Sequence, residues 1–159
     1  MRSRTQPGRS TAAARGDVVV FHIGMRINHF WAVHRWLPVF LAMPRMLREL
    51  SRDPSAGLLG HQLLSGSPRT YYVVQYWESK EKLLAYAAAP DKLHRPAWAK
   101  FNRHARDSKQ HVGIWHETYV VPEGSYESIY GDMPPHGLGK AHGVVPLRDG
   151  VQAADRLAA

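Results

Sequence analysis

The chain has 159 residues, which is enough for one domain and hardly enough for two. Hydrophobic residues make up 44% of it and charged residues 21%, so a wholly disordered chain is excluded. It contains no cysteine, which excludes disulfides, cysteine-ligated zinc, iron–sulfur clusters, thiolate-ligated haem and cysteine nucleophiles.

The formal charge is +8, and half of it lies in residues 1–16, which contain four arginines and no acidic residue. This segment has almost no large apolar side chain to bury, so we predict a disordered basic tail, with a targeting or nucleic-acid-binding arm as the alternative. It has no apolar stretch typical of a secretory signal, and we expect a cytoplasmic protein. The weakly patterned residues 142–159 are predicted to form a mobile tail.

Residues 17–25 are predicted to form a strand covered on both faces, because only His22 interrupts their apolar pattern. Residues 30–50 repeat large apolar side chains at helical spacing, and Pro38 and Pro44 predict two helical pieces. This stretch is too short and too rich in arginine to span a bilayer. A helix that faces the core is therefore favoured over an interfacial membrane helix.

Residues 58–64 and 70–77 are predicted to be strands joined by a hairpin-length turn, with Gly60 marking a bulge or a close backbone approach. Ser79 is predicted to cap the next helix. A further helical piece is expected over residues 96–105, after which the chain reaches its last long strand.

That last strand, residues 112–121, completes the order strand–helix–strand–strand–helix–strand. This order predicts an α+β, ferredoxin-like fold over residues 17–122, with a four-stranded antiparallel sheet and helices on one face. The strands look apolar on both faces, so we expect the uncovered face to meet the sheet of a second copy in a homodimer. Residues 123–141 are expected to form an ordered C-terminal arm or flap.

The densest polar cluster in an apolar context lies in the last strand. Strand alternation places His116 and Thr118 on one face and Trp115, Glu117 and Tyr119 on the other. A carboxylate among apolar neighbours needs a partner or a raised pKa, which makes Glu117 a candidate for acid–base chemistry.

Histidine offers the other acid–base candidates. His22 is expected near the last strand, where it could form an acid–base pair or a haem site with His116. His22, His116 and Glu117 together could form a non-haem metal set, but no local spacing supports one, so we predict no metal site. The structural alternatives are a hydrogen-bonded core histidine and an ion pair between Glu117 and an arginine such as Arg26.

Aromatic and histidine side chains provide candidates for the wall of a pocket that binds a flat, apolar substrate. The same aromatic residues would serve equally well as ordinary core. The chain has no phosphate-binding glycine loop and no nucleophile elbow. The candidate substrate-binding residues are Tyr76, Trp77, His94, Trp98, Trp115 and Tyr119.

Several runs are more specific than the architecture: GMRIN, AMPRMLREL, VQYW, VGIWHETY and YESIYGDMPP. Together they resemble a family of small bacterial and fungal proteins named after a monooxygenase of the fumagillin pathway. The resemblance covers about residues 18–140. It implies the dimeric α+β barrel fold of the antibiotic-biosynthesis monooxygenases. Relatives oxidise polyketide or terpenoid carbon without metal, haem or flavin, or bind haem for aldoxime dehydration or haem breakdown.

The leading functional prediction is a monooxygenase that needs no cofactor and acts on an aromatic or polyketide-like molecule in an apolar pocket. His116 would be the acid–base residue, His22 or Glu117 would set its protonation, and Trp115 would shape the wall.

Two alternatives remain. One is a haem-binding protein of the aldoxime-dehydratase or haem-degrading type, with a histidine axial ligand and Arg45 or Arg48 on the propionates. The other is a small-ligand-binding dimer without enzymatic activity. Nucleic-acid binding is not expected, because the chain outside the basic tail carries only half of the formal charge and its aromatic strands look covered.

Overall fold

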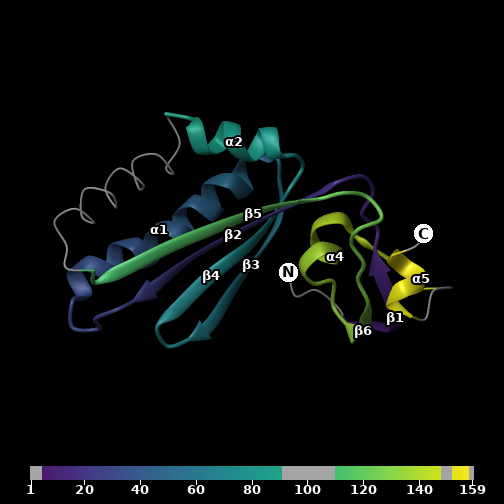
Figure 1. The fold of residues 1–159 in the computed structure, drawn as a ribbon, viewed down its shortest axis with the longest axis horizontal. Helices are drawn as coiled ribbons and strands as arrows, with labels where there is room; N and C mark the ends of the chain where they lie inside the picture. Colours follow the sequence, from purple (N-terminus) through teal and green to yellow (C-terminus); the bar gives the residue numbers. More distant parts are fainter. Residues whose placement is uncertain (1–4, 91–109, 148–151, 158–159) are drawn as a thin grey trace.

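The structure is a computed structural model that describes residues 5–90, 110–147 and 152–157. Two antiparallel sheets organise the chain (Figure 1). The larger sheet has the strand order β3-β4-β2-β5, and the smaller has the order β6-β1-β7. The larger sheet contains β2 (Val18–Ile27), β3 (Leu58–Ser67), β4 (Thr70–Trp77) and β5 (Val112–Val121).

The larger sheet, with α1 (Val33–Arg52) and α2 (Lys80–Ala88), confirms the predicted α+β, ferredoxin-like arrangement. Its strands form where β-branched and aromatic residues concentrate, as in Thr70–Trp77. The predicted cap is present, since the Ser79 hydroxyl accepts the Lys82 backbone N–H at 3.2 Å. The register shifts between Leu58 and Gly60, which is the bulge expected there. None of the helices in the described part of the chain combines the length and apolarity that crossing a bilayer requires.

The two helical pieces predicted around Pro38 and Pro44 are one continuous helix, so that prediction was wrong. Each proline removes one backbone hydrogen bond from the helix. Packing of the apolar side against the sheet offsets this loss, with Leu47 and Leu50 fully buried.

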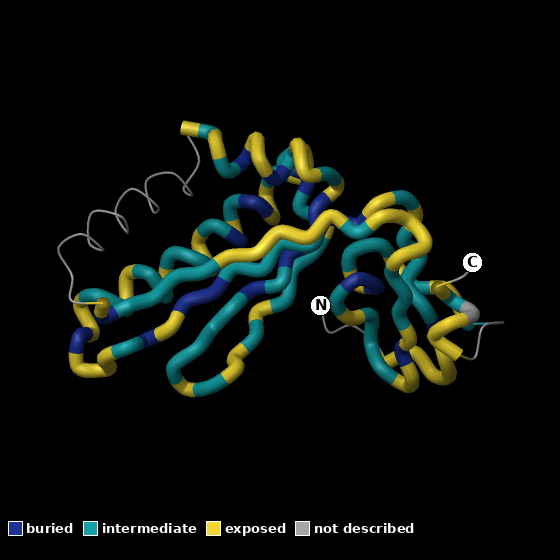
Figure 2. The backbone as a smooth tube through the Cα atoms, viewed as in Figure 1, coloured by how far each residue is buried: buried dark blue, intermediate teal, exposed yellow. Residues whose placement is uncertain are grey.

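The register of the larger sheet decides which side chains face the helices. Val19 pairs with Trp77, and Phe21 pairs with Gln75, so these alternate residues of β2 and β4 share one face. That face carries the main core, which α1 and α2 cover (Figure 2). The core consists of Val19, Leu50, Trp77, Leu83 and Tyr86.

The smaller sheet corrects the prediction of disorder for the part of residues 1–16 that forms a strand. Its central strand is β1 (Gln6–Ala12), which pairs with β6 (Tyr130–Met133) on one side and β7 (Val144–Pro146) on the other. The segment gains its order from backbone pairing and from distant polar groups rather than from apolar burial. For example, the Ala12 N–H donates to the Ser128 hydroxyl at 2.9 Å.

The mobile tail predicted for residues 142–159 is also corrected. Its first part contributes β7 to the smaller sheet, and α5 (Ala153–Leu157) follows. The guanidinium of Arg156 lies 2.8 Å from a carboxylate oxygen of Glu127, and both side chains are largely buried. This ion pair attaches α5 to the smaller sheet and the segments that pack on it, which together we call the smaller unit.

The segment 123–141, expected to be an arm or flap, contributes β6 and α4 (Gly137–His142) to the smaller unit. Helix α4 packs on the sheet face that α1 and α2 leave open, where a Cβ at Gly60 would lie 3.1 Å from Ala141. Gly137 in turn lies against the Tyr76 hydroxyl. The segment therefore covers one end of the open face and not the helix-covered face.

His142, at the end of α4, is expected to make the smaller unit sensitive to acid. Its Nε2 is buried without a hydrogen-bond partner among the described residues, and burial lowers the pKa of the ring. The unfolded chain takes up a proton near pH 6.5, which the folded state resists. Stability is therefore full above this pH and falls as the pH drops toward the lower folded pKa.

Hydrogen exchange of the α4 and β7 amides at about pH 7.5 and about pH 5.5 measures this effect, after correction for the intrinsic exchange rate. His142→Leu should reduce the dependence on pH, whereas His136→Leu, which removes an exposed histidine of the same region, should leave it unchanged. Part of the dependence should survive in His142→Leu, because burial and the charge of Lys140 also lower the pKa of His61. Equal protection at both pH values would contradict the prediction.

Candidate functional site

An apolar cavity lies between the larger sheet and the helices that cover it. The enclosed space is only about 30 Å³, and its mouth is open to solvent. Apolar and aromatic side chains dominate the wall, as is usual for sites that bind small molecules. The lining residues are Phe21, Ile23, Met43, Met46, Leu50, Gln75, Trp77, Leu83, Tyr86 and Ala87.

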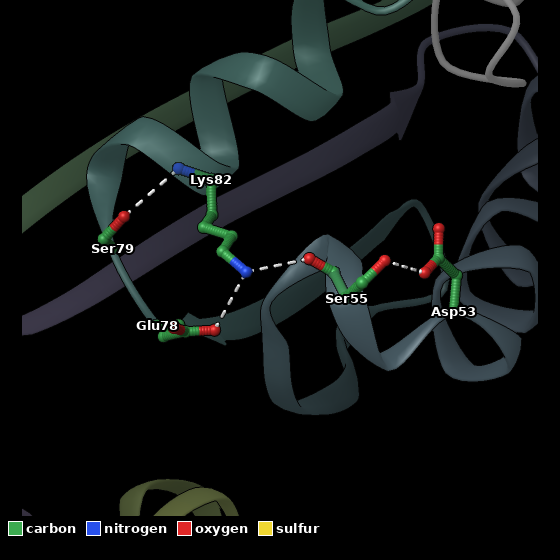
Figure 3. Close-up of polar contacts among 5 residues, drawn as sticks. All are labelled: Asp53, Ser55, Glu78, Ser79 and Lys82. Atoms are coloured by element: carbon green, nitrogen blue, oxygen red, sulfur yellow. Dashed lines mark hydrogen bonds and ion pairs between the residues drawn. The ribbon is translucent and has the colours of Figure 1, made fainter.

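Helix α2 forms one wall, and a polar cluster at its start fixes its position (Figure 3). The Lys82 ammonium donates to the Ser55 carbonyl at 2.9 Å and lies 3.4 Å from the Glu78 carboxylate. Gly57 makes this approach possible, since its φ is +85° and a Cβ there would lie 2.8 Å from the Lys82 side chain. Leu83 and Tyr86 are thereby held over the sheet.

Gln75 is the most buried polar side chain of the wall, with 4% of its surface exposed. The Trp77 indole N–H donates to its Oε1 at 2.9 Å. Because an indole N–H can only donate, this bond fixes the carboxamide with its oxygen toward Trp77. The NH₂ group makes no hydrogen bond with the described residues and is available to a ligand in the cavity.

Tyr86 brings the second polar group to the wall. Its hydroxyl donates to Oε2 of Glu49 on α1 at 3.0 Å. Burial raises the pKa of Tyr86, and the hydrogen bond to Glu49 raises it further. The phenol therefore stays protonated at neutral pH and does not act as a base.

His116 faces the same side of the sheet as the cavity. It pairs with Ile23 in the register of β2 and β5, and its ring lies 5.7 Å from the ring of Phe21. Both Ile23 and Phe21 line the cavity. The side chain itself is exposed, and it stands beside the wall rather than in it.

His22 and Glu117 lie on the opposite face, where they pair directly in the register of β2 and β5. The predicted acid–base pair of His22 and His116 was therefore wrong, and so was the assignment of Glu117 to the protonation of His116. The sequence correctly placed His22 beside the last strand. Alternation placed His116 and Glu117 on opposite faces of β5, but it did not show which face the helices cover.

Glu117 has a different partner from the one expected. Its carboxylate accepts the Tyr119 hydroxyl at 2.6 Å, and this bond raises the pKa of Tyr119. No ion pair between Glu117 and Arg26 occurs in the described part of the chain. Because β5 is an edge strand, Glu117 is exposed and its carboxylate keeps its solvation (Figure 2).

The candidate metal set is split in the same way, since His116 projects from one face and His22 and Glu117 from the other. Within residues 5–90, 110–147 and 152–157, no three histidine or acidic side chains gather closely enough to hold a metal ion.

The predicted substrate-binding residues also lie on different faces of the larger sheet. Trp77 lines the cavity, whereas Tyr76 faces α4 on the other side of the sheet. Trp115 also lies on that open side, with its indole so close to Gly24 that a Cβ there would be 2.6 Å away. Tyr119 shares that side, where its ring lies 5.6 Å from that of His22.

The other two predicted substrate-binding residues, His94 and Trp98, lie outside the described residues.

The described part of the cavity wall offers no axial ligand for a haem. Haem iron takes an axial ligand such as histidine, cysteine thiolate or tyrosine, and methionine serves together with histidine. No histidine occurs among the described residues of the lining, and the Tyr86 hydroxyl already donates to Glu49. Arg45 and Arg48, suggested for the propionates, are exposed on α1.

Gln75 was missed by sequence reasoning. It lies in the aromatic strand TYYVVQYW, where a lone polar residue is followed two positions later by tryptophan. Residues two apart share a face of a strand, so this spacing was the available signal that a carboxamide and an indole N–H could pair.

Comparison with known proteins agrees with the resemblance seen in the sequence. The family described as monooxygenase af470-like matches residues 18–138. Monooxygenase af470 of Aspergillus fumigatus is 36% identical over 135 residues, covering 79% of this chain and 46% of that protein. The chain thus spans about half the length of this curated relative.

One solved structure supports the fold, and a second is reported for comparison. An aldoxime dehydratase in complex with butyraldoxime superposes with a TM-score of 0.70 at 14% identity, over 90% of this chain and 41% of that one. SnoaB, a cofactor-independent oxygenase from Streptomyces nogalater, matches with a TM-score of 0.47 at 16% identity, over 67% of this chain and 95% of that one. The aldoxime dehydratase supports the fold alone, and the family follows from the sequence matches: the chain belongs to the monooxygenase af470-like family.

Proposed function

We propose that this protein is a monooxygenase that oxidises an aromatic or polyketide-like molecule in the apolar cavity, without metal, haem or flavin. Membership of the monooxygenase af470-like family supports the reaction class. The observation that carries the proposal is Gln75, a buried hydrogen-bond donor held by Trp77 within an otherwise apolar wall. Such a wall suits a flat, apolar ring system that carries one oxygen.

The proposed chemistry starts from a carbon acid next to a carbonyl, as in an anthrone. A base takes a proton from the methylene group, and the negative charge moves onto the carbonyl oxygen as an enolate. The enolate reduces O₂ through its carbon. One oxygen atom of O₂ becomes the carbonyl oxygen of the new ketone, and the other leaves as water. In sum, CH₂ and O₂ give C=O and H₂O. Apolar walls exclude bulk water from the reactive carbanion.

Gln75 stabilises the enolate in this scheme. Its NH₂ group donates to the substrate oxygen on which charge develops, and it needs no reorganisation because Trp77 already holds the carboxamide. The donor acts in an apolar wall, where a hydrogen bond to a charged oxygen is stronger than in water.

His116 is proposed as the base, because its ring lies 5.7 Å from the ring of Phe21 in the cavity wall. His116→Ala is expected to lower kcat about 10²–10⁴-fold, the usual contribution of a positioned acid–base group. The side chain is exposed, so the variant should fold normally. His34→Ala, which removes an exposed histidine of α1, is the matched control and should keep full activity.

The test uses an anthrone that becomes a strongly absorbing anthraquinone on oxidation, with oxygen uptake followed in the same cuvette. The proposal expects one O₂ consumed for each anthraquinone formed, with the same rate after exhaustive treatment with a metal chelator. Catalysis that requires added haem would overturn it, as would an oxidation rate equal to that of buffer. An unchanged rate in His116→Ala would remove His116 from the mechanism but leave the site.

The proposal includes a homodimer joined through the open face of the larger sheet. Apolar side chains there, such as Val20, Tyr72 and Val74, are only half-buried, and α4 covers only the end near Tyr76. A second copy presents the same surface and would complete their burial.

Sedimentation velocity tests this assembly. The wild-type chain is expected to sediment as two chains, and Val74→Lys as one, because a charge would be buried at the interface. Leu63→Lys is the matched control, since Leu63 is 54% exposed on the neighbouring strand and shares the helix-covered face with Val73. A wild-type protein that sediments as a single chain at micromolar concentration would contradict the assembly.

A further inference from the structure

A pair of histidines lies apart from the cavity, where β2 ends and β5 begins. His29 follows β2, His111 precedes β5, and their Nδ1 atoms are 3.0 Å apart. Neither ring belongs to the cavity wall. We propose that His29 and His111 form a binding site for a divalent transition-metal ion that prefers ligands at right angles, such as Cu²⁺ or Ni²⁺.

The backbone around the pair is held in place from several directions. The Asn28 N–H donates to the His111 carbonyl at 2.9 Å, and the Asn28 side chain donates to the Gln110 carbonyl at 2.7 Å. The Arg69 guanidinium donates to the Asn28 carbonyl at 2.9 Å. Because this backbone is already ordered, binding of an ion would cost little conformational entropy, and this favours affinity.

Gln110, directly before His111, has a φ of 53°, a left-handed conformation that is uncommon for a residue other than glycine. Backbone in such a conformation persists only where its surroundings impose it. Here the Gln110 carbonyl is held by Asn28. The turn thus directs His111 back toward His29 at a small conformational cost.

The separation of the two nitrogens is close to that of neighbouring ligands on a tetragonal ion. Imidazole nitrogens lie about 2.0–2.1 Å from a bound metal ion. Two such ligands 3.0 Å apart enclose an angle of about 90–95° at the metal. A tetrahedral ion would need the nitrogens about 3.3 Å apart, whereas neighbouring positions of a tetragonal Cu²⁺ or Ni²⁺ ion match the observed spacing.

The same spacing suits a single proton shared in an N–H···N hydrogen bond, since two protons do not fit between these nitrogens. An ion 2.0–2.1 Å from both nitrogens would lie off the line that joins them, so each ring would turn toward it as the ion replaces the shared proton, and binding would release that proton. No third histidine or acidic ligand joins the pair in the described part of the chain.

Trp31 provides an internal reporter. Its ring lies 4.8 Å from the ring of His111 and 5.9 Å from that of His29, and 71% of the residue is exposed. A paramagnetic ion such as Cu²⁺ at the pair should quench its fluorescence. Trp31→Phe should lose this part of the quenching and keep the binding.

The test titrates CuCl₂ into the full chain in a buffer without metal-binding components, followed by calorimetry and by the electron paramagnetic resonance of Cu²⁺. One ion per chain is expected, with a spectrum typical of tetragonal nitrogen and oxygen ligation. Zn²⁺ should bind more weakly. His29→Ala removes an exposed ligand and should bind at least about tenfold more weakly, while His136→Ala, a distant exposed histidine, should bind as the wild type does.

Wild-type affinity in His29→Ala would overturn the site, as would the absence of a stoichiometric Cu²⁺ complex in the wild-type chain. His111→Gln gives a second check, since removing this imidazole should also eliminate the Cu²⁺ resonance signal that is typical of nitrogen ligands. Circular dichroism of each variant shows that the fold is intact. These outcomes do not depend on the proposed oxygenation, because anthrone turnover can be measured in the same variants.

Discussion

Replacing Gln75 by leucine should lower kcat/KM for anthrone oxidation about 10²–10³-fold, the range found when one donor to a developing oxyanion is removed. Leucine has nearly the same size and keeps the wall apolar, but it offers no hydrogen bond to the substrate oxygen. The Trp77 N–H also loses its acceptor, which should cost about 1–3 kcal/mol of stability. Initial rates at several anthrone concentrations measure the first effect and urea unfolding the second.

Gln75→Glu separates the two consequences. The carboxylate still accepts the Trp77 N–H, but it no longer donates to an oxygen, so activity should stay low although the partner of Trp77 is restored. Gln62→Leu is the matched control, because it makes the same chemical change at a glutamine on the open face of the neighbouring strand. A Gln75→Leu enzyme with wild-type kcat/KM would exclude Gln75 from the mechanism.

Trp77→Ala is expected to lower the free energy of unfolding by about 3–5 kcal/mol, the usual cost of removing a large aromatic ring from a core. Trp77 is 2% exposed and packs with Val19, Leu50 and Leu83. Its ring also lies 5.8 Å from that of Tyr86. Alanine would therefore leave a cavity where sheet and both helices meet.

Equilibrium unfolding in urea, extrapolated linearly to water, measures this loss. Trp31→Ala provides the contrast, since Trp31 is 71% exposed and its loss should change stability by no more than about 0.5 kcal/mol. Trp77→Phe keeps most of the packing and should cost less than alanine. A Trp77→Ala variant within about 1 kcal/mol of the wild type would contradict the placement of the core.

The larger sheet could be predicted from the sequence because its signals are local. Strand β4 is dense in aromatic and β-branched residues, and Ser79 is a strong helix cap. Alternation also placed His116 and Glu117 on opposite faces of β5. Local patterning does not show which face the helices cover, and this is why the candidate site combined residues from both.

The smaller sheet could not be predicted, because its order depends on partners far away in the sequence. Strand β1 contains glycine and proline and no large apolar residue, which locally indicates a tail. Its partners lie more than 110 residues later, and nothing within Gln6–Ala12 indicates them. The pair of His29 and His111 was missed for the same reason, since only the pairing of β2 with β5 brings them together.

The position of β1 between β6 and β7 also has a consequence for synthesis on the ribosome. Both neighbours of β1 follow the whole larger sheet in the chain, so β1 is made before its partners and pairs last. Contacts of such long sequence separation form slowly, because a long loop must close first. While the larger sheet is being synthesised, the nascent chain therefore exposes β1 without its partners, and the smaller sheet closes only after β7 has been made.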